Sequence, residues 1–251
     1  RKVFSRAGKA VVAIENLDLA VDEGEFVSIV GPSGCGKTTL LHIVGGFEKP
    51  SSGRLAFFGR DILGPGPDRG VMFQEFSLYP WRTVIGNVGW GLEVQGMARA
   101  ERTEIAERYL EMVGLSAFRD HYPAELSGGM KQRVALARTL AFDPKLLLMD
   151  EPFGALDAQT REIMQEELQR IYERNRKTIV FITHDIDEAV YLGDRVLVFS
   201  ARPGRIKEAV RIDLPRPRAL EIKKAAEYHA YRNRIWDLLR DEVVRTRAEF
   251  P

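Results

Sequence analysis

The chain has 251 residues, with 37 lysine and arginine residues against 36 aspartate and glutamate residues, and a single cysteine. A hydrophobic fraction of 45% and a balanced charge exclude a disordered chain and argue against nucleic-acid binding through bulk positive charge. No apolar run approaches the roughly 20 residues that span a bilayer, and residues 1–13 lack the apolar stretch of a signal peptide. We therefore expect a soluble cytosolic chain whose thiol, Cys35, forms no internal disulfide.

Short apolar runs alternate with helical patterns along most of the chain. The runs expected to form strands are residues 26–30, 55–58, 71–73, 145–149, 178–182 and 195–199. Helices are expected at residues 37–45, 84–94, 100–113, 127–141, 158–174 and 186–192. Alternating strands and helices predict a parallel sheet with helices on its faces. The all-helical block from about residue 78 to 142 indicates an insertion into that α/β core.

The last part of the chain has a different character. Residues 201–251 carry 13 basic and 8 acidic side chains, and apolar residues recur at helical spacing from Leu220 onward. We favour a solvated helix that is packed by one apolar stripe. A basic surface that faces a membrane or a partner is the alternative.

Residues 31–38 fit the phosphate-loop pattern G-x-x-x-x-G-K-[ST] in its required setting, after a strand and before a helix. Glycines let backbone N–H groups curve around phosphate oxygens, and the positive end of the helix dipole adds to that attraction. Lys37 supplies a charge to the β- and γ-phosphates, and the Thr38 hydroxyl suits Mg²⁺. Cys35 is expected to fill space rather than to react. The predicted nucleotide contacts in this segment are Gly31, Pro32, Ser33, Gly34, Cys35, Gly36, Lys37, Thr38 and Thr39.

Two adjacent acids follow the apolar strand at residues 146–149. Asp150 and Glu151 end that strand, and Pro152 prevents its continuation. Adjacent carboxylates at the carboxyl end of a buried parallel strand are costly unless they are paired or bind a metal, and ligands bind at this edge of open α/β sheets. We therefore predict that Asp150 holds Mg²⁺ and that Glu151 orients the attacking water as a general base.

A second glycine-rich helix start lies at Ser127, Gly128 and Gly129. Ser127 suits an ordinary helix N-cap. The glycine pair nevertheless weakens the first turn, and Lys131 and Arg133 place positive charge where the helix dipole disfavours it. Both departures make sense if an anion docks on this helix end.

Together, these patterns resemble the ATPase subunit of ABC transporters over nearly the whole chain. Residues 126–130 are similar to the family's signature motif, with methionine at the last position, where glutamine is commonest. Gln74 resembles the Q-loop glutamine, which contacts Mg²⁺ and the attacking water, and Asp157 closes a segment that resembles the D-loop. His184 resembles the switch histidine that contacts the γ-phosphate. Phe4 resembles the aromatic residue that stacks on adenine, a position where family members often have tyrosine.

The resemblance implies an α/β fold with a P-loop NTPase (RecA-like) core and a mostly parallel sheet. It adds an N-terminal antiparallel β portion, an inserted α-helical subdomain at about residues 78–142 and a C-terminal helical tail. The implied domains are an ABC ATPase domain at residues 1–218 and a helical extension at residues 219–251.

The resemblance also implies ATP and Mg²⁺ as cofactors and a head-to-tail pair of identical chains. Each ATP would lie between residues 31–39 of one chain and residues 127–129 of the other. The region from Gln74 to Trp81 would receive a helix of a membrane permease, so the subunit would be peripheral on the cytoplasmic face of the inner membrane. Trp81 is equally consistent with a core aromatic of the helical block. The implied metal ligands are Thr38, Gln74 and Asp150, and the implied catalytic residues are Glu151, His184 and Gln74.

Within the family, residues 73–81, 149–157 and 203–205 are most similar to the nitrate/sulfonate/taurine group of importer ATPases. That group takes up small anions through a helical permease and a receptor, which would meet this subunit only indirectly. The transported molecule does not touch the subunit, so the sequence does not identify it. The alternatives are an exporter ATPase, a soluble ABC ATPase outside transport, and a P-loop kinase of a small metabolite. The kinase would leave His184 without a role, and Glu151 argues against a pure binding module.

Overall fold

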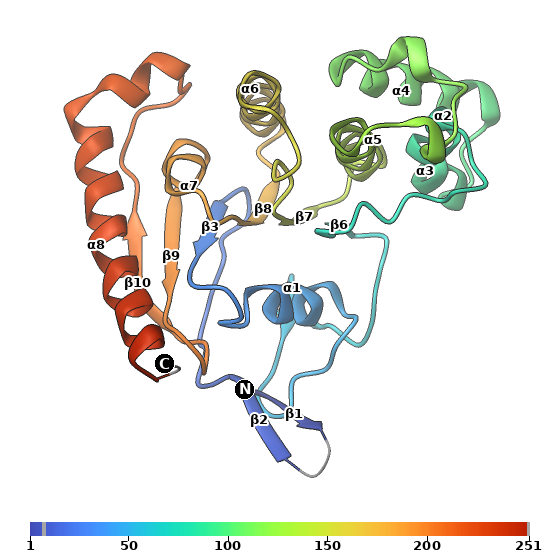
Figure 1. The fold of residues 1–251 in the computed structure, drawn as a ribbon. Helices are drawn as coiled ribbons and strands as arrows, with labels where there is room; N and C mark the ends of the chain where they lie inside the picture. The colour runs from blue at the N-terminus through green and yellow to red at the C-terminus, as the bar shows by residue number, and fades with distance from the viewer. Residues whose placement is uncertain (7–8, 250–251) are drawn as a thin grey trace. The chain divides into compact units, whose positions relative to one another are not determined.

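A computed structural model describes residues 1–6 and 9–249 of the chain, and Figure 1 labels its elements. The described residues of Arg1–Gly66 and Asn175–Pro251 form one compact unit, and Pro67–Arg174 form a second. The predicted ATPase domain at residues 1–218, its helical subdomain at about 78–142 and the extension at 219–251 stay predictions. Residues 250 and 251 of that extension lie outside the described part of the chain.

The first unit is built on parallel strands whose positions match the sequence prediction. β8 (Thr178–Ile182), β3 (Phe26–Val30) and β9 (Arg195–Phe199) lie side by side in that order and run parallel. Every residue of β3 and β8 is buried, as their mostly apolar sequences require. β10 (Ile206–Arg211) pairs antiparallel with β9. It was not predicted, because Val210 is its only fully buried residue and its sequence has no apolar run.

Short antiparallel pairs complete the β structure of this unit. β1 (Lys2–Arg6) and β2 (Lys9–Ile14) form the N-terminal hairpin, which confirms the predicted antiparallel portion. The strand expected at residues 55–58 is shorter, with β4 (Ala56–Phe57) pairing with β5 (Arg60–Asp61). The helices of the unit are α1 (Lys37–Gly45), α7 (Ile186–Leu192), the 3-10 helix η3 (Leu220–Lys224) and α8 (Ala226–Glu249).

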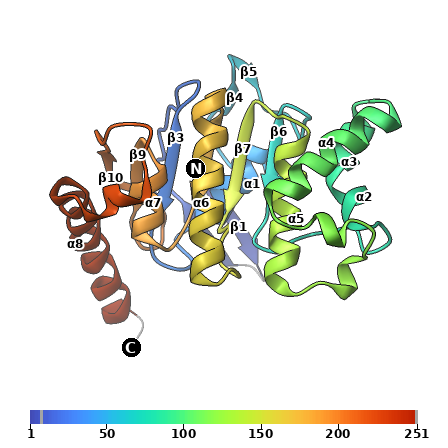
Figure 2. The ribbon, with the colours of Figure 1, turned by 90° about the horizontal axis from the view of Figure 1, so that it is seen from above.

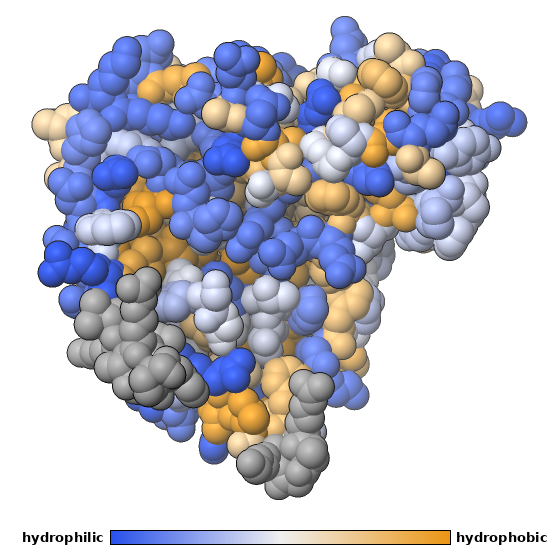
Figure 3. Space-filling model, in the orientation of Figure 1, coloured by the Kyte–Doolittle hydropathy of each residue, from blue (hydrophilic) through white to orange (hydrophobic). Residues whose placement is uncertain are grey.

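The C-terminal helix α8 packs on the first unit through a single stripe. Tyr228, Ile235 and Glu242 recur every seventh residue and are all buried, whereas Trp236 is exposed. The helix contacts α7 and β9, and Figure 2 shows it alongside α7 and β10. Hydrophilic side chains cover most of its visible outer side (Figure 3). The favoured interpretation, a solvated helix with one packed stripe, is therefore confirmed, although the helix begins at Ala226 and η3 occupies the start of the predicted pattern.

The second unit carries one parallel strand pair and most of the helices. β6 (Arg69–Met72) runs parallel to β7 (Leu146–Asp150). α5 (Gly128–Ala141) lies at the centre of the helical part, in contact with β6 and with three other helices. The helices of this unit are α2 (Val84–Val88), α3 (Trp90–Val94), α4 (Arg99–Met112), α5 and α6 (Ala158–Asn175), with 3-10 turns η1 (Ser116–Phe118) and η2 (Pro123–Glu125).

One predicted helix of the second unit is wrong. The helix expected at residues 84–94 is two short helices, α2 and α3, that meet at Gly89. Glycine weakens a helix interior, and Gly91 two residues later lies so close to Phe142 that a Cβ there would be 2.7 Å from the Phe142 Cβ. We attribute the break between α2 and α3 to Gly89 and to the packing of Gly91 against Phe142. The spacing of apolar residues along the chain reveals neither.

Candidate nucleotide site

The phosphate loop follows β3 and leads into α1, as the motif requires. Its glycines are demanded by geometry, since a Cβ on Gly31 would lie 2.8 Å from the Cβ of Phe199. Gly36 is the N-cap of α1 with φ of 104°, and a Cβ there would lie 2.9 Å from the carbonyl oxygen of Ala13. Only glycine combines this left-handed backbone with so close an approach. The close packing at Gly31 and Gly36 therefore leaves the loop few alternative conformations, and glycine residues leave its backbone accessible to an anion.

The ammonium group of Lys37 is held inside this loop. Its Nζ donates to the carbonyl oxygens of Gly31, at 2.8 Å, and Pro32, at 3.0 Å. Lys37 is also the first residue of α1, where backbone N–H groups have no partner within the helix. A buried cation and the positive end of a helix thus meet at one place, which is the electrostatic setting of a phosphate site.

Cys35 behaves as the space-filling residue that the sequence suggested. Its side chain is buried in the loop, and burial raises the pKa of the thiol above its usual value, although Lys37 opposes the shift. A thiol with a raised pKa is less ionised at neutral pH and is a poor nucleophile.

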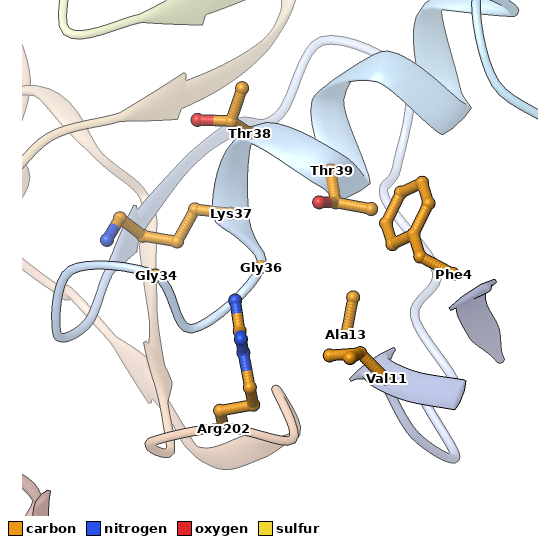
Figure 4. Close-up of a pocket in the computed structure, with 9 residues that line it drawn as sticks. All are labelled: Phe4, Val11, Ala13, Gly34, Gly36, Lys37, Thr38, Thr39 and Arg202. Carbon is orange, nitrogen blue, oxygen red and sulfur yellow. The ribbon is translucent and has the colours of Figure 1, made fainter. Parts of the chain in front are cut away.

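A pocket opens beside the phosphate loop within the first unit (Figure 4). Phe4 of β1 lies on one side with the apolar residues Val11 and Ala13 of β2, and the loop and Arg202 lie on the other. An aromatic face next to an anion-binding loop suits a ligand with a planar ring at one end and phosphates at the other. The full lining is Phe4, Val11, Ala13, Gly34, Gly36, Lys37, Thr38, Thr39 and Arg202.

His184 lies at the same edge of the first unit as the phosphate loop. β3 and β8 are parallel neighbours, so the residues that follow them emerge at one edge. His184 is exposed there, and the residues on either side of it are fixed: the Thr183 hydroxyl donates to Glu188, and Asp185 caps α7. The histidine is thus presented to solvent by a rigid turn and does not serve the core.

In the second unit, Gln74 and Glu151 share an edge in the same way. Met72 of β6 lies opposite Met149 of β7, and each of the two predicted residues stands two positions beyond that pair. Gln74 is exposed, whereas Asp150 is 3% exposed at the end of β7. This unit therefore gathers the amide and both carboxylates that the sequence predicted to act together.

Glu151 has an unusual backbone, with φ of 49°. A side chain in this left-handed region is strained unless its surroundings hold it. Gln132 of α5 provides the restraint: its Nε2 donates to the Glu151 carbonyl oxygen at 3.1 Å, and its Oε1 accepts from the Ala155 N–H at 2.8 Å. The sequence analysis missed Gln132. The available signal was a polar residue on the apolar stripe of α5.

The signature-like residues cap α5 and touch the turn after Glu151. The Ser127 hydroxyl accepts from the Met130 N–H at 3.3 Å, which confirms the N-cap. A Cβ on Gly129 would lie 3.3 Å from the Ala155 carbonyl oxygen. Arg133 does not serve the helix end, because its guanidinium donates to the Val113 carbonyl oxygen, and burial lowers its pKa. The prediction that Arg133 places its charge at this helix end is therefore wrong.

Asp157 also has a local role. Its carboxylate accepts from the Thr160 N–H at 3.0 Å in the first turn of α6, and this hydrogen bond lowers the pKa of Asp157 below its usual value. Asp157 is therefore ionised at neutral pH and turned to its own helix. Its predicted contact across a dimer stays a prediction.

The segment from Gln74 to Trp81 is anchored at several points. Arg138 of α5 donates to the carbonyl oxygens of Phe76 and Ser77. Asn87, fully buried, accepts from the Tyr79 N–H and donates to the Tyr79 carbonyl oxygen. Trp81 is 72% exposed, so the alternative of a core aromatic is wrong. An exposed tryptophan on a well-anchored segment is a feature of interaction sites.

Replacing Gln132 by alanine is expected to lower kcat about tenfold with little change in KM, because two hydrogen bonds that hold the Glu151 turn are lost. Steady-state ATPase kinetics measure the effect. Gln95 is a matched control, since its Nε2 donates to the Phe142 carbonyl oxygen from an exposed position in the same unit. A kcat for Gln132→Ala equal to that of Gln95→Ala would show that the restraint on Glu151 does not matter for turnover.

A phosphate loop at the edge of a parallel sheet defines this chain as a P-loop nucleoside triphosphate hydrolase. The family model described as ABC transporter matches residues 14–154, and the chain belongs to this family. It is an ABC ATPase, an enzyme that couples ATP hydrolysis to transport. The resemblance and the α/β P-loop fold that the sequence predicted are thereby confirmed, whereas the roles of individual residues stay predictions.

Several characterised and uncharacterised proteins resemble this chain closely. It is 54% identical over 245 residues to an uncharacterized ABC transporter ATP-binding protein of Methanocaldococcus jannaschii, which covers 98% of this chain and 91% of the relative. It is 49% identical to the nitrate import ATP-binding protein NrtD of Synechocystis over 95% of this chain and 92% of the relative. It is 46% identical to the bicarbonate transport ATP-binding protein CmpC of Synechococcus elongatus over 91% of this chain but only 35% of that relative.

Solved structures of ATP-binding cassettes also resemble this chain. A dimeric ATP-binding cassette in a post-hydrolysis state, bound to ADP and Pi, aligns with a TM-score of 0.78 and 35% identity, over 85% of this chain and 97% of that one. Within residues 1–6 and 9–249, no helix has both the length and the apolar character needed to cross a bilayer.

Proposed function

We propose that this chain is the ATP-hydrolysing subunit of an importer for a small anion. The observation that carries the proposal is the 49% identity to a nitrate import ATP-binding protein across 92% of that protein. A bicarbonate transport protein, which is 46% identical to this chain, supports the same class of transported molecule, a small anion. The cargo would be nitrate, a sulfonate such as taurine, or an anion of similar size.

The pocket and the loop support a specific mode of ATP binding. The adenine would stack on Phe4, and the phosphates would meet the backbone N–H groups of residues 31–39 and the Lys37 ammonium. Thr38, Asp150 and Gln74 would hold Mg²⁺, which would supply positive charge against the phosphates. Hard oxygen ligands of this kind, completed by phosphate oxygens, are typical of Mg²⁺. Accordingly, the described residues contain no cluster of three or more histidine, cysteine, aspartate or glutamate side chains that could hold a metal by itself.

Hydrolysis would depend on Glu151 and His184. Glu151 would accept a proton from the attacking water, since its carboxylate follows a buried strand and its backbone is held by Gln132. His184 would donate a hydrogen bond toward the γ-phosphate from its exposed turn. Two chains would enclose two ATP molecules, with Ser127, Gly128 and Gly129 of one chain completing the site of the other. The dimeric cassette of 35% identity supports this assembly.

The membrane permease would dock on the segment from Gln74 to Trp81. Trp81 would be its apolar anchor, because it is the most exposed aromatic on a segment that Arg138 and Asn87 hold in place. The subunit would then be peripheral, on the cytoplasmic face of the inner membrane, and the receptor for the anion would meet it only through the permease.

Copurification from the native host tests this proposal. A tagged chain, extracted with membranes in mild detergent, is expected to bring down a polypeptide with several membrane spans. Trp81→Ala is expected to reduce that yield severalfold. The matched control is Trp236→Ala on α8, which removes an exposed tryptophan from the other unit. Recovery of the chain without any membrane partner would overturn the importer. Equal yields from both variants would overturn the docking segment.

A further inference from the structure

The segment between β9 and β10, residues 200–205, has no role in the proposed function. In the sequence, residues 203–205 indicate only a similarity to one group of importer ATPases. We call residues 200–205 the arginine loop, since Arg202 and Arg205 are its charged members. Its position, its contacts and its tether to α8 together indicate a role in nucleotide binding.

The topology of the first unit brings the arginine loop to the phosphate loop. β9 is the parallel neighbour of β3 on the side opposite β8. Val30 lies opposite Val198, so both loops leave the sheet side by side at the same edge. Three neighbouring strands thus end together, followed by His184, by the phosphate loop and by the arginine loop.

Close contacts fix the arginine loop in that position. The Gly204 N–H donates to the Ala13 carbonyl oxygen at 2.9 Å, and the Glu15 N–H donates to the Gly204 carbonyl oxygen at 3.0 Å. A Cβ on Gly204 would lie 2.0 Å from the carbonyl oxygen of Cys35, inside the phosphate loop. The arginine loop is therefore pinned to β2 and in van der Waals contact with the phosphate loop.

The two arginines of this loop have different surroundings. Arg205 forms an ion pair with Glu15. Arg202 instead lines the pocket (Figure 4), where its Nη2 lies 4.0 Å from the position of a Cβ on Gly34. Among the residues whose side chains the structure describes (1–5 and 10–242), no carboxylate forms an ion pair with Arg202. Arg202 and Lys37 therefore line one pocket from two elements, and a guanidinium binds phosphate oxygens with a well-matched geometry.

The C-terminal helix reaches the residue next to Arg202. Glu242 of α8 is buried, and its Oε2 accepts from the Ala201 N–H at 3.0 Å. Its Oε1 lies 3.0 Å from the Nζ of Lys207, which also donates to the Leu238 carbonyl oxygen. The backbone next to Arg202, and Lys207 just beyond the other end of the arginine loop, are thus both bound to α8.

We propose that Arg202 is a further nucleotide-binding residue that contacts the phosphate chain, and that α8 positions it through Glu242. The proposal rests on the ATP site of the proposed function but not on the importer, because nucleotide binding needs no membrane partner. The proposal assigns a function to α8, because the affinity for nucleotide would depend on how this helix holds the arginine loop.

Nucleotide affinities of the purified chain test the contact. Arg202→Ala is expected to weaken the binding of ATP and of ADP about tenfold, which is the effect of losing one charge-assisted hydrogen bond. The binding of adenosine is expected to stay unchanged, because adenosine has no phosphate. Arg202→Lys is expected to restore part of the loss. Arg205→Ala is the matched control, since its ion pair is exposed and contributes little. Unchanged ATP affinity in Arg202→Ala, or an equal loss with adenosine, would overturn the phosphate contact.

A double-mutant cycle tests the positioning role of Glu242. Glu242→Ala is expected to raise KM for ATP severalfold without lowering kcat, and to raise it no further when Arg202 is already alanine. Glu242→Gln, which keeps an oxygen for the Ala201 N–H, is expected to be intermediate and tests the contact if the alanine variant does not fold. Equal increases in KM on both backgrounds, or no increase at all, would overturn the positioning role.

Discussion

Replacement of Glu151 by glutamine is expected to lower the rate of ATP hydrolysis about a thousandfold, the scale of a lost general base, while ATP still binds. The substitution keeps the size of the side chain and removes only its capacity to accept a proton. The left-handed turn, which Gln132 holds through backbone groups, is retained. Single-turnover hydrolysis and equilibrium ATP binding measure the two effects separately.

The same variant reports on the assembly. Because bound ATP is not consumed, Glu151→Gln is expected to dimerise with Mg-ATP and to remain monomeric with ADP, as measured by light scattering. Glu166→Gln, on the helix that follows the same turn, is a control for the loss of one negative charge. A turnover equal to wild type would remove Glu151 from the base role, and a monomeric mass at saturating ATP would contradict the sandwich of two chains.

Replacement of Lys37 by alanine is expected to weaken ATP binding about a hundredfold, because charge-assisted hydrogen bonds to the phosphates are lost. The ammonium is buried and already oriented by the carbonyl oxygens of Gly31 and Pro32, so little ordering is needed when ATP arrives. Calorimetric titration with ATP in the presence of Mg²⁺ measures the affinity.

A stability measurement must accompany the Lys37 titration, because the ammonium also closes the loop. The melting temperature of Lys37→Ala is expected to stay within a few degrees of wild type, since the loss is confined to the hydrogen bonds that the ammonium makes within one loop. Lys49→Ala removes a lysine from the loop that follows α1 and is expected to change neither quantity. Wild-type affinity in Lys37→Ala would contradict the phosphate site at this loop.

The sequence predicts the buried part of the fold well, and it fails where side chains are exposed. β3 and β8 match their prediction because four of the five residues in each are apolar, and such a short run is stable only when it is buried. β10 lies at the edge of its unit's sheet with one buried residue, so its pairing depends on β9 and leaves no local pattern. The division of residues 84–94 into two helices depends on a contact between Gly91 and Phe142, which are more than 50 positions apart in the chain.

The residues of the candidate site likewise differ in how far the sequence predicts them. Residues whose proposed chemistry is tied to a local motif, such as Lys37 and Glu151, can be predicted from the sequence because neighbouring glycines and strand ends mark them. Gln132 and Arg202 are found only in three dimensions. Gln132 acts on a turn 19 residues later, and Arg202 reaches the pocket because β9 lies beside β3. No spacing rule along the chain connects such residues to the loops that they serve.

The left-handed backbone of Glu151 has an evolutionary consequence. Such a conformation costs a residue with a side chain about 1 kcal/mol or more, whereas glycine adopts it freely. Mutation followed by selection for heat resistance alone would therefore favour the loss of the carboxylate at this codon. A thermostable descendant obtained in that way would be a better-folded protein without the proposed general base, so any stabilised version has to be selected for turnover as well.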